Sequence, residues 1–367
     1  MARRIVLFGA TGYTGRLTAE AFVARGARPV LAARSEDKLR RLAEELGGDL
    51  ETAPADVNRP ESVRALVDEG DVLVSTVGPF ARFGSPAVEA AIAAKAIYVD
   101  STGEPPFIRR VFERWDGPAR DAGASLLTAF GYDWVPGNLA GALALREAGE
   151  AATRVVLGYF ITGRGGFSGG TRASAAGALV ESGFAYIGGQ LVTERPAARV
   201  HSFQVRGRSR PAISVASSEH FALPRVHPSL QDVDAYLGWF GAASRPMQGF
   251  SLMMSGITRV PGVRGGLDAV LGRMVKGSTG GPSREERAAA HSHVVAFACD
   301  SAGTQLAEVR LEGVNGYDFT AGMLAWAAMR AAEQGVHGTG ALGPVEAFGL
   351  DDLEAGAAEA GISTIDS

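Results

Sequence analysis

A short apolar run that leads directly into a glycine-rich turn constrains the fold of this chain more than any other feature. Residues 5–8 are Ile, Val, Leu and Phe, and the next seven residues read Gly-Ala-Thr-Gly-Tyr-Thr-Gly. Four β-prone apolar residues before a turn are typical of a strand buried on both faces of a parallel sheet. Gly9 permits the tight turn, Gly12 lets a pyrophosphate approach the backbone, and Gly15 allows the next helix to pack closely. That helix, beginning near Tyr13, directs its N-terminal amides toward an anion.

The residues after the second expected strand favour a dinucleotide that carries a 2′-phosphate. The glycine spacing is G-x-x-G-x-x-G, a variant of the NAD-type fingerprint, and residues 29–33 read as the next strand. The following position, where NAD-binding folds place an acid, is Arg34. A guanidinium suits a 2′-phosphate, and Ser35 and Lys38 lie within reach of it, although Lys38 could equally belong to a solvated helix face. The NADPH-binding residues predicted here are Gly9, Thr11, Gly12, Tyr13, Thr14, Arg34, Ser35 and Lys38.

Length and charge narrow the function classes. A chain of 367 residues exceeds one typical core, so two domains are expected. The formal net charge is −4, from 36 basic and 40 acidic residues, so no global basic field exists to attract nucleic acid. The single cysteine, Cys299, excludes a disulfide within the chain and a cysteine-rich zinc site. We therefore expect no nucleic-acid partner and no metal.

We expect no signal peptide, because the first apolar run is short and continues into the glycine turn. No uninterrupted apolar stretch approaches the roughly 20 residues that span a bilayer. A cytoplasmic location is the expectation.

Residues 14–127 alternate between short apolar runs and amphipathic segments, the pattern of a parallel sheet covered by helices. The predicted strands cover residues 4–8, 29–33, 50–53, 71–76, 97–99 and 124–128. The predicted helices cover residues 13–26, 35–46, 59–68, 84–95 and 105–122. The fold class is therefore α/β, a Rossmann-type doubly wound parallel sheet whose ligands bind outside the carboxyl ends of its strands.

Two turns at those carboxyl ends carry residues suited to a dinucleotide. Asp56 could accept a hydrogen bond from the adenine amino group with Val57 against the ring, or it could serve as a helix N-cap. After the strand at 71–76, Gly78 and Pro79 leave space for the ribose and nicotinamide to pass close to the backbone. Phe80 could wall the nicotinamide ring or pack in the core. The cofactor-binding residues predicted in these turns are Asp56, Val57, Val77, Gly78, Pro79 and Phe80.

A third turn, Ser101-Thr102-Gly103-Glu104, ends the strand near residues 97–99. Its carboxylate and hydroxyls are placed to meet the nicotinamide carboxamide or a substrate, although Glu104 could instead complement a helix N-terminus. We predict Ser101, Gly103 and Glu104 as cofactor-binding residues.

With these motifs in place, the chain resembles the saccharopine dehydrogenase-like oxidoreductases, especially the bacterial branch that includes trans-acting enoyl reductases. The resemblance covers nearly the whole chain. It rests on residues 9–15, on Gly78-Pro79-Phe80 with Phe83-Gly84, on Tyr-Val-Asp-Ser-Thr-Gly-Glu at 98–104, on Gly-Tyr-Asp-Trp-Val-Pro-Gly-Asn-Leu at 131–139, on Ser-Gly-Gly-Thr-Arg-Ala-Ser at 168–174 and on Gly-Pro-Ser at 281–283. Where the family pattern reads Gly-Phe-Asp-Ser-Val-Pro-Ser-Asp, this chain carries Tyr132, Trp134, Gly137 and Asn138, which could reshape the pocket.

The resemblance implies a division of the chain into two domains and an NADPH-dependent oxidoreductase activity. Residues 1–135 would form the NADP-binding Rossmann domain, completed by C-terminal helices within 318–367. Residues 136–317 would form a substrate-binding α+β domain with a mixed or antiparallel sheet. The expected reaction is reduction of an activated C=C bond in a hydrophobic or biosynthetic intermediate. Imine or ketone reduction, and a non-catalytic NADP-binding partner protein, are the alternatives.

The second domain opens with an alternating strand at 154–162, followed by a glycine-rich loop and a helix expected over 171–187. That loop could bind a substrate anion or act as a lid or domain joint. Strands at 293–299 and 305–312 flank hairpin-forming residues. The apolar stretch at 231–276 could be core, the wall of a lipid tunnel, or a membrane-touching flap. A carrier-bound or lipid-like small-molecule substrate, membrane contact and a homodimer are all left open.

Reduction also requires a proton donor, since hydride transfer leaves an enolate, alkoxide or amine to be quenched. We predict Tyr132 as that donor, because its loop follows the strand at 124–128, with Asp133 orienting it or meeting a cationic imine. Tyr132 could alternatively pack at a domain joint. No tyrosine precedes a lysine by four residues, so a short-chain dehydrogenase pair is absent. His291 and His293 would share one strand face but lack a third metal ligand.

Overall fold

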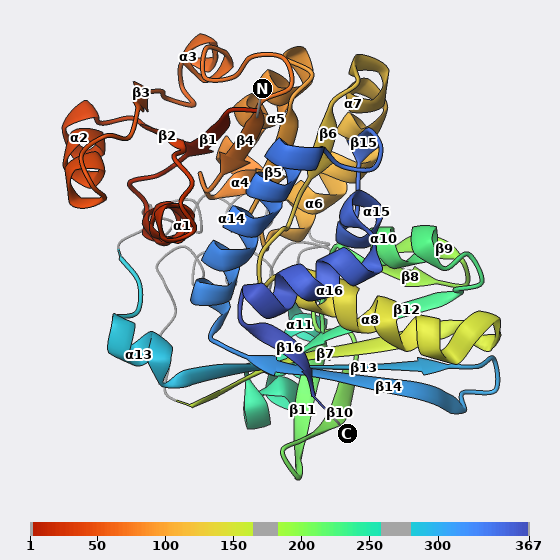
Figure 1. Ribbon diagram of the computed structural model, residues 1–367. Helices are drawn as coiled ribbons and strands as arrows, with labels where there is room; N and C mark the ends of the chain where they lie inside the picture. The colour runs from red at the N-terminus through yellow and green to blue at the C-terminus, as the bar shows by residue number, and fades with distance from the viewer. Residues whose placement is uncertain (1–2, 164–182, 258–279, 366–367) are drawn as a thin grey trace. The chain divides into compact units, whose positions relative to one another are not determined.

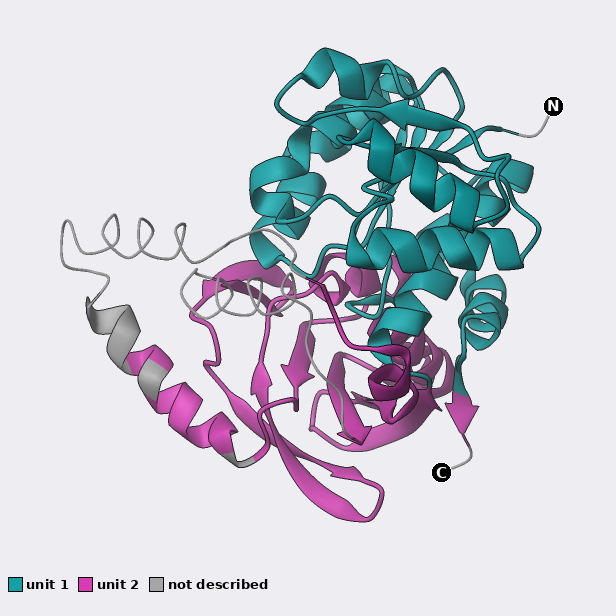
Figure 2. Cartoon of the chain, turned by 90° about the vertical axis from the view of Figure 1, so that its left-hand side faces the viewer, with its two compact units in different colours: residues 1–135, 314–363 teal, residues 136–313, 364–367 magenta. Residues whose placement is uncertain are grey.

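The computed structural model describes residues 3–163, 183–257 and 280–365. The chain divides into two compact units, shown in different colours in Figure 2. Unit 1 comprises residues 1–135 and 314–363, and unit 2 comprises residues 136–313 and 364–367. Each unit is built around its own sheet.

The sheet of unit 1 has the order β15-β6-β5-β4-β1-β2-β3, and all its printed pairings are parallel. Its strands are β1 (Ile5–Phe8), β2 (Val30–Ala33), β3 (Thr52–Pro54), β4 (Val72–Ser75), β5 (Ile97–Asp100), β6 (Ser125–Leu127) and β15 (Gly340–Ala341). Strands β2, β4 and β5 are buried along their whole length, because helices cover both faces. The strand order reverses at β1, which lies between β4 and β2. A crevice for a ligand is expected at that switch point.

Helices cover this sheet and connect its strands in order (Figure 1). They are α1 (Tyr13–Ala24), α2 (Glu36–Glu45), α3 (Pro60–Arg64), α4 (Phe80–Phe83), α5 (Ser85–Ala93), α6 (Pro105–Arg110), a π-helical turn (Val111–Trp115), α7 (Asp116–Ala122), α14 (Gly316–Gln334), α15 (Pro344–Phe348) and α16 (Leu350–Glu359). The longest, α14, is capped by Asn315, whose side chain accepts hydrogen bonds from the amides of Tyr317 and Asp318. It buries eleven residues and contacts α1, β1, β4 and β5. The C-terminal part of the chain thus supplies core to the N-terminal unit.

The sheet of unit 2 is mixed. Its strands are β7 (Arg154–Gly163), β8 (Gly183–Ile187), β9 (Gln190–Glu194), β10 (Val200–Val205), β11 (Arg208–Ser214), β12 (Asp232–Leu237), β13 (Ala290–Cys299), β14 (Gln305–Gly313) and β16 (Ile362–Ile365). Strand β7 pairs in parallel with β12 and antiparallel with β13, and the order along the sheet is β10-β11-β12-β7-β13-β14-β16. One face carries a core cluster that includes Phe160, Phe203 and Tyr236.

The described helices of unit 2 are α8 (Val135–Ala148, from the boundary), α10 (Glu219–Val226), α11 (Ser244–Ile257) and α13 (Arg284–Ala288), with 3₁₀ turns at Gly149–Ala151 and Gly241–Ala243. Across the described ranges, no helix is long and apolar enough to cross a membrane.

The predicted fold class is confirmed: unit 1 is a doubly wound parallel sheet and unit 2 carries a mixed sheet. The predicted hairpin of β13 and β14 is also confirmed. The helix expected at 105–122 is interrupted by the π-helical turn, and the one expected at 59–68 ends at Arg64.

The prediction of a helix over residues 171–187 is wrong for its C-terminal end. Residues Gly183–Ile187 form β8, which pairs antiparallel with β9, while residues 171–182 and the loop at 164–170 lie outside the described residues. The reason is the dipeptide Gly188-Gly189, whose φ angles are +60° and +77°. Two glycines with positive φ form the two-residue turn that joins hairpin strands.

Candidate active site

The glycine loop after β1 has the close packing that its spacing predicts. Gly9 adopts a φ of +93°, which side chains rarely tolerate. A Cβ atom at Gly15 would lie 2.1 Å from the carbonyl oxygen of Gly9, so only glycine lets α1 pack this close. Gly12 is the N-cap of α1, and neither a side-chain cap nor an acidic residue occupies the first turn. The helix therefore presents its N-terminal amides without a competing carboxylate.

The turn after β4 lies against this glycine loop at the switch point. The amide of Thr76 donates to the carbonyl oxygen of Phe8 over 2.9 Å, continuing the β1–β4 ladder. A Cβ atom at Gly9 would lie 2.6 Å from the Thr76 hydroxyl oxygen and 3.0 Å from Cγ2 of Val77. Thus Val77, a predicted cofactor residue, lies next to the glycine loop.

The residues after β2 are arranged as a helix start. Arg34 is exposed and forms no ion pair within the part of the chain that is described. Ser35 is the N-cap of α2, and its hydroxyl accepts a hydrogen bond from the amide of Lys38 over 3.4 Å. The Arg34 side chain is therefore exposed, whereas the Ser35 hydroxyl already has a structural partner.

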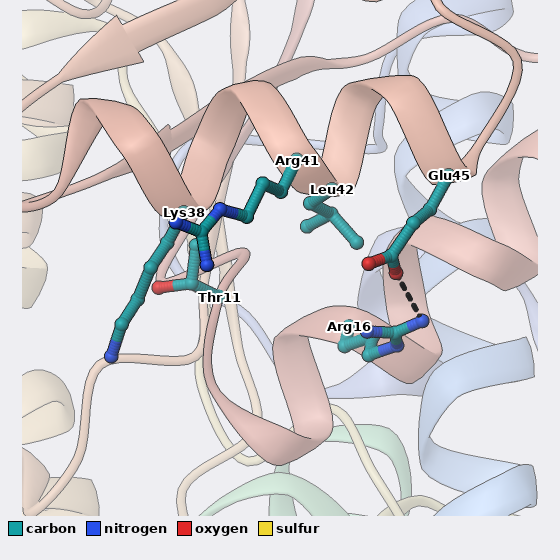
Figure 3. Close-up of a pocket in the computed structure, with 6 residues that line it drawn as sticks. All are labelled: Thr11, Arg16, Lys38, Arg41, Leu42 and Glu45. Atoms are coloured by element: carbon teal, nitrogen blue, oxygen red, sulfur yellow. Dashed lines mark ion pairs between the residues drawn. The ribbon is translucent and has the colours of Figure 1, made fainter.

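A pocket of about 190 Å³ lies between the glycine loop, α1 and α2 (Figure 3). Lys38 and Arg41 line it from α2, Thr11 from the glycine loop, and Leu42 contributes an apolar wall. Arg16 and Glu45 close one end with an ion pair of 2.5 Å, drawn as a dashed line in Figure 3. Of the residues predicted to hold a phosphate, Thr11 and Lys38 line this pocket, and Arg34 and Ser35 do not.

Asp56 is engaged in its own turn after β3. Its Oδ1 accepts hydrogen bonds from the amide and the side-chain nitrogen of Asn58 over 2.9 and 3.0 Å. The N-cap of α3 is Arg59, so Asp56 is not that cap. Asp56 and Val57 are both partly exposed, and their adenine contact stays a prediction.

The loop at residues 78–80 is held by Glu104. Its two carboxylate oxygens accept hydrogen bonds from the amides of Phe80 and Ala81, each over 2.9 Å. The carboxylate thus complements the N-terminus of α4, a different helix from the one that follows it in sequence. Phe80 is buried and its ring centroid lies 5.6 Å from that of Phe107. Phe80 and Glu104 therefore shape the loop that presents Gly78 and Pro79.

Asp100, at the end of β5, joins two loops at the carboxyl edge of the sheet. Its Oδ1 accepts hydrogen bonds from the amides of Thr102 and Ala129 over 2.8 and 2.9 Å. Its Oδ2 accepts from the hydroxyl of Thr128 over 2.8 Å. Burial raises the pKa of Asp100 to about 6, although these hydrogen bonds oppose the rise. The Ser101–Glu104 turn and the loop after β6 are thereby fixed next to each other.

Asp133 differs from Asp100 and Glu104, the carboxylates described above at this edge, in its hydrogen bonding. A Cβ atom at Gly103 would lie 2.9 Å from Oδ2 of Asp133, so the carboxylate rests against this glycine. Its Oδ1 is fully covered and has no hydrogen-bond partner among the described residues. Desolvation alone raises the pKa of Asp133 to about 7. A carboxyl group that titrates near neutral pH can donate or accept a proton at the edge where the cofactor is expected.

Tyr132 lies in the packing around α14. Its ring centroid is 6.4 Å from that of Phe319, and a Cβ atom at Gly316 would lie 2.9 Å from its ring. Its amide donates to the hydroxyl of Thr320 over 3.0 Å. The side chain is 4% exposed. This geometry favours the packing interpretation of Tyr132 and leaves Asp133 as the stronger candidate for proton transfer.

Sequence reasoning did not single out Thr76, Asp100 or Arg41 as contributors to this site. A spacing signal existed for Arg41, because residues 38, 41 and 45 share one helix face. In contrast, the burial of Asp100 depends on neighbouring strands and has no local signal.

Comparison with known families now assigns the N-terminal region. Residues 5–124 match the saccharopine dehydrogenase NADP binding domain family. These residues are therefore similar to an NADP binding domain of that family. The match includes the glycine loop, the end of β2 and the turns after β4 and β5. The predicted resemblance and the predicted cofactor class are confirmed.

The same resemblance extends to curated relatives and to a solved structure. A candidate trans-acting enoyl reductase of Mycobacterium tuberculosis is 44% identical over 181 residues, which cover 46% of this chain and 42% of that protein. A trans-acting enoyl reductase of Mycobacterium bovis is 39% identical over 140 residues, covering 37% of this chain and 34% of the relative. Each match therefore spans less than half of the relative's length.

The fold is similar to that of saccharopine dehydrogenase. The apo structure of saccharopine dehydrogenase (L-Glu forming) from Saccharomyces cerevisiae matches with a TM-score of 0.58 and covers 99% of this chain and 100% of its own. At 15% sequence identity, this likeness establishes the fold alone.

Proposed function

We propose that this protein is an NADPH-dependent reductase of an activated C=C bond in a small-molecule substrate, with Asp133 as the proton donor. The observation that carries the proposal is Oδ1 of Asp133, which is covered and has no hydrogen-bond partner among the described residues, in a carboxyl group whose pKa burial raises to about 7. It lies against Gly103, next to the turn at residues 101–104. The relatives named as enoyl reductases support a C=C acceptor.

The described residues of unit 1 fit the cofactor. The open N-terminus of α1 suits a pyrophosphate, since nothing in its first turn competes for the amides. Gly9, Gly12 and Gly15 keep that approach free of side chains. The cations after β2 suit a 2′-phosphate. The turn at Val77–Pro79, fixed by Glu104, is proposed to line the nicotinamide.

NADPH, when bound, supplies the hydride. Addition of a hydride to the β-carbon of an enoyl group leaves negative charge on the α-carbon and carbonyl oxygen, and the α-carbon must then receive a proton. Protonated Asp133 can donate that proton and become a carboxylate, which water later reprotonates. Because its pKa is about 7, a large fraction of Asp133 carries the proton at neutral pH.

The buried contacts of Asp100 and Glu104 serve a different purpose. Neither carboxylate needs to exchange a proton, since each accepts hydrogen bonds from backbone amides of the loops at this edge. We propose that they are positioning residues, which hold the turns at 78–80 and 101–104 at the carboxyl ends of β4 and β5. The substrate would then meet a preorganised edge.

NADPH oxidation with enoyl thioesters, enones, imines and ketones tests the proposal. We expect turnover of the C=C acceptors, with kcat falling above pH 7 as Asp133 loses its proton. Asp133→Asn should lower kcat by roughly 10² to 10⁴ while NADPH affinity is retained. Tyr132→Phe is the matched control and should keep most of the activity. A greater loss in Tyr132→Phe than in Asp133→Asn would contradict the assignment. Tight NADPH binding without turnover of any acceptor would instead indicate a binding partner protein.

A further inference from the structure

We propose that Thr162, His293 and Glu312 form a second catalytic site, in unit 2, that hydrolyses small acyl esters or thioesters. Their side chains form a continuous row of hydroxyl, imidazole and carboxylate groups. Oγ1 of Thr162 lies 2.7 Å from Nε2 of His293, and Nδ1 of His293 lies 2.8 Å from Oε1 of Glu312. Hydrolases with a hydroxyl nucleophile use this order of groups to activate the oxygen for attack on a carbonyl carbon. The reaction needs no NADPH.

Three neighbouring strands of the unit 2 sheet bring these side chains together (Figure 1). Strand β13 pairs antiparallel with β7 on one side and with β14 on the other. His293 of β13 lies directly opposite Glu312 of β14. Thr162 of β7 lies opposite His291, which places it diagonally across from His293, within reach of a long side chain. The strand register therefore fixes the row.

The row lies on the sheet face that carries the core cluster of unit 2. Phe160 and Val295 both belong to that cluster. Thr162 is two residues after Phe160, and His293 is two residues before Val295, so their side chains point to the same face. His293 is almost fully covered, whereas Thr162 is partly exposed and the Glu312 side chain is 30% exposed. The imidazole is thus held away from water, while Thr162 remains open to solvent.

The surroundings of His293 favour a neutral imidazole, the form that can accept a proton. Burial lowers the pKa of His293, and the facing Glu312 carboxylate offsets part of this change. Arg206 and Arg210 lower the pKa further through their positive charge. With the Nδ1 proton facing the carboxylate, Nε2 is left to accept the proton of the Thr162 hydroxyl.

Arg210 can stabilise the negative charge that forms on the carbonyl oxygen during attack. It lies in β11 opposite Phe203, a member of the core cluster, and its charge acts on His293. Its Nε atom is covered and has no hydrogen-bond partner among the described residues. The Arg310 guanidinium donates to the carbonyl oxygen of Gln204 over 2.7 Å, which ties β10, the hairpin partner of β11, to β14. A covered cationic donor without a partner suits an oxyanion.

The reaction proceeds through an acylated threonine. The Thr162 oxygen forms a bond to the carbonyl carbon while its proton passes to Nε2 of His293. The bond from the acyl carbon to the thiol sulfur or alcohol oxygen then breaks, and the leaving group takes that proton. Water next gives a proton to Nε2 and attacks the acyl carbon, and the proton returns to Thr162 as the acid departs. Because packed core side chains fill the face beyond Thr162, we expect only a short acyl group to fit.

Hydrolysis of p-nitrophenyl acetate and of S-acetyl-N-acetylcysteamine by the full-length protein tests this inference. Thr162→Val and His293→Gln should each lower kcat at least roughly 10²-fold, whereas Thr162→Ser should keep the activity. Glu312→Gln should lower kcat with KM unchanged, because this positioning residue acts through His293. Arg210→Met should lower kcat by roughly 10²-fold. Thr304→Val is the matched control and should keep full activity, because Thr304 is an exposed threonine of the same unit.

Acid quenching during turnover, followed by peptide mass mapping of the unaltered protein, should find the acetyl group on Thr162. This measurement does not depend on the folding of any variant, and urea unfolding of each variant separates a lost reaction from a lost fold. Hydrolysis no faster than in buffer, acetylation confined to other residues, or equal rates in folded Thr162→Val and Thr304→Val would overturn the proposal. A purely structural row would lower stability in Thr162→Val without changing the rate.

Discussion

Replacing Asp133 by asparagine is expected to stabilise the protein at neutral and alkaline pH and to have little effect near pH 4. Burial raises the pKa of this carboxyl group from 3.8 to about 7. The folded state therefore binds the Asp133 proton more tightly than the unfolded state does. Between these two pKa values the unfolded state releases the proton and the folded state keeps it, so stability falls as pH rises from about 4 to 7. Asparagine cannot ionise, so the variant lacks this loss.

The size of the effect follows from the pKa rise. About 1.4 kcal/mol corresponds to each pKa unit, so the rise to about 7 is equivalent to about 4 kcal/mol once Asp133 is ionised in both states. At pH 5 the corresponding penalty is about 1.7 kcal/mol, and at pH 4 it is below about 1 kcal/mol. The stability advantage of Asp133→Asn should therefore grow by about 3.7 kcal/mol between pH 4 and pH 8. Asp100 titrates identically in both proteins and cancels from the difference.

Urea unfolding at several pH values, followed by tryptophan fluorescence, measures this difference. Trp134 adjoins the substituted residue and is buried, so its emission reports on the same region. Asp121→Asn is the control, because Asp121 is an exposed aspartate of the same unit. The difference in the free energy of unfolding between Asp121→Asn and the unaltered protein should not change with pH. A difference between Asp133→Asn and the unaltered protein that stays constant from pH 4 to pH 8 would refute the reasoning.

Three further changes test the cofactor loop and the start of α8. Arg34→Asp should weaken binding of NADPH much more than of NADH, because it places an anion beside the 2′-phosphate; equal losses in a binding titration would remove Arg34 from that role. Gly15→Ala should destabilise unit 1 by about 1 to 3 kcal/mol and weaken NADPH binding, since its Cβ atom meets a backbone oxygen at 2.1 Å. Gly117→Ala, with open space around it, should change urea unfolding little. Gly137→Ser should also destabilise, by about 1 to 3 kcal/mol, because a Cβ atom there would lie 2.1 Å from the buried hydroxyl of Tyr159; unchanged unfolding would show that Tyr159 can move.

The fold of unit 1 could be predicted because its signals are local. The strand at residues 5–8, the glycine turn and the helix after it are contiguous, and each supports the others. The antiparallel β8–β9 hairpin differs from the helix predicted over residues 171–187, although Gly188-Gly189 is a strong local turn signal. Strand β15 has only two residues and exists through its pairing with β6, which no local pattern indicates.

The sequence allowed us to predict which residues form the candidate site. It was a weaker guide to the role of each residue. Glu104 was expected near the nicotinamide or a helix N-terminus, but the helix it caps begins at Phe80, which sequence separation conceals. Tyr132 and Asp133 are neighbours in sequence and have opposite surroundings in the structure. The Tyr132 ring packs against α14, while Oδ1 of the adjacent Asp133 is covered and has no hydrogen-bond partner among the described residues. Burial of this kind arises from tertiary packing, which the sequence pattern does not encode locally.

The contribution of α14 to unit 1 affects the order in which the protein can fold. During synthesis, residues 1–135 emerge well before residues 316–334, so the apolar surfaces of β1, β4 and β5 that α14 later contacts are exposed in the nascent chain. Exposed apolar surface and unpaired strands favour aggregation of such intermediates. The mature packing of the sheet of unit 1 is therefore completed only after α14 has been made, and the nascent chain exposes this apolar surface until then.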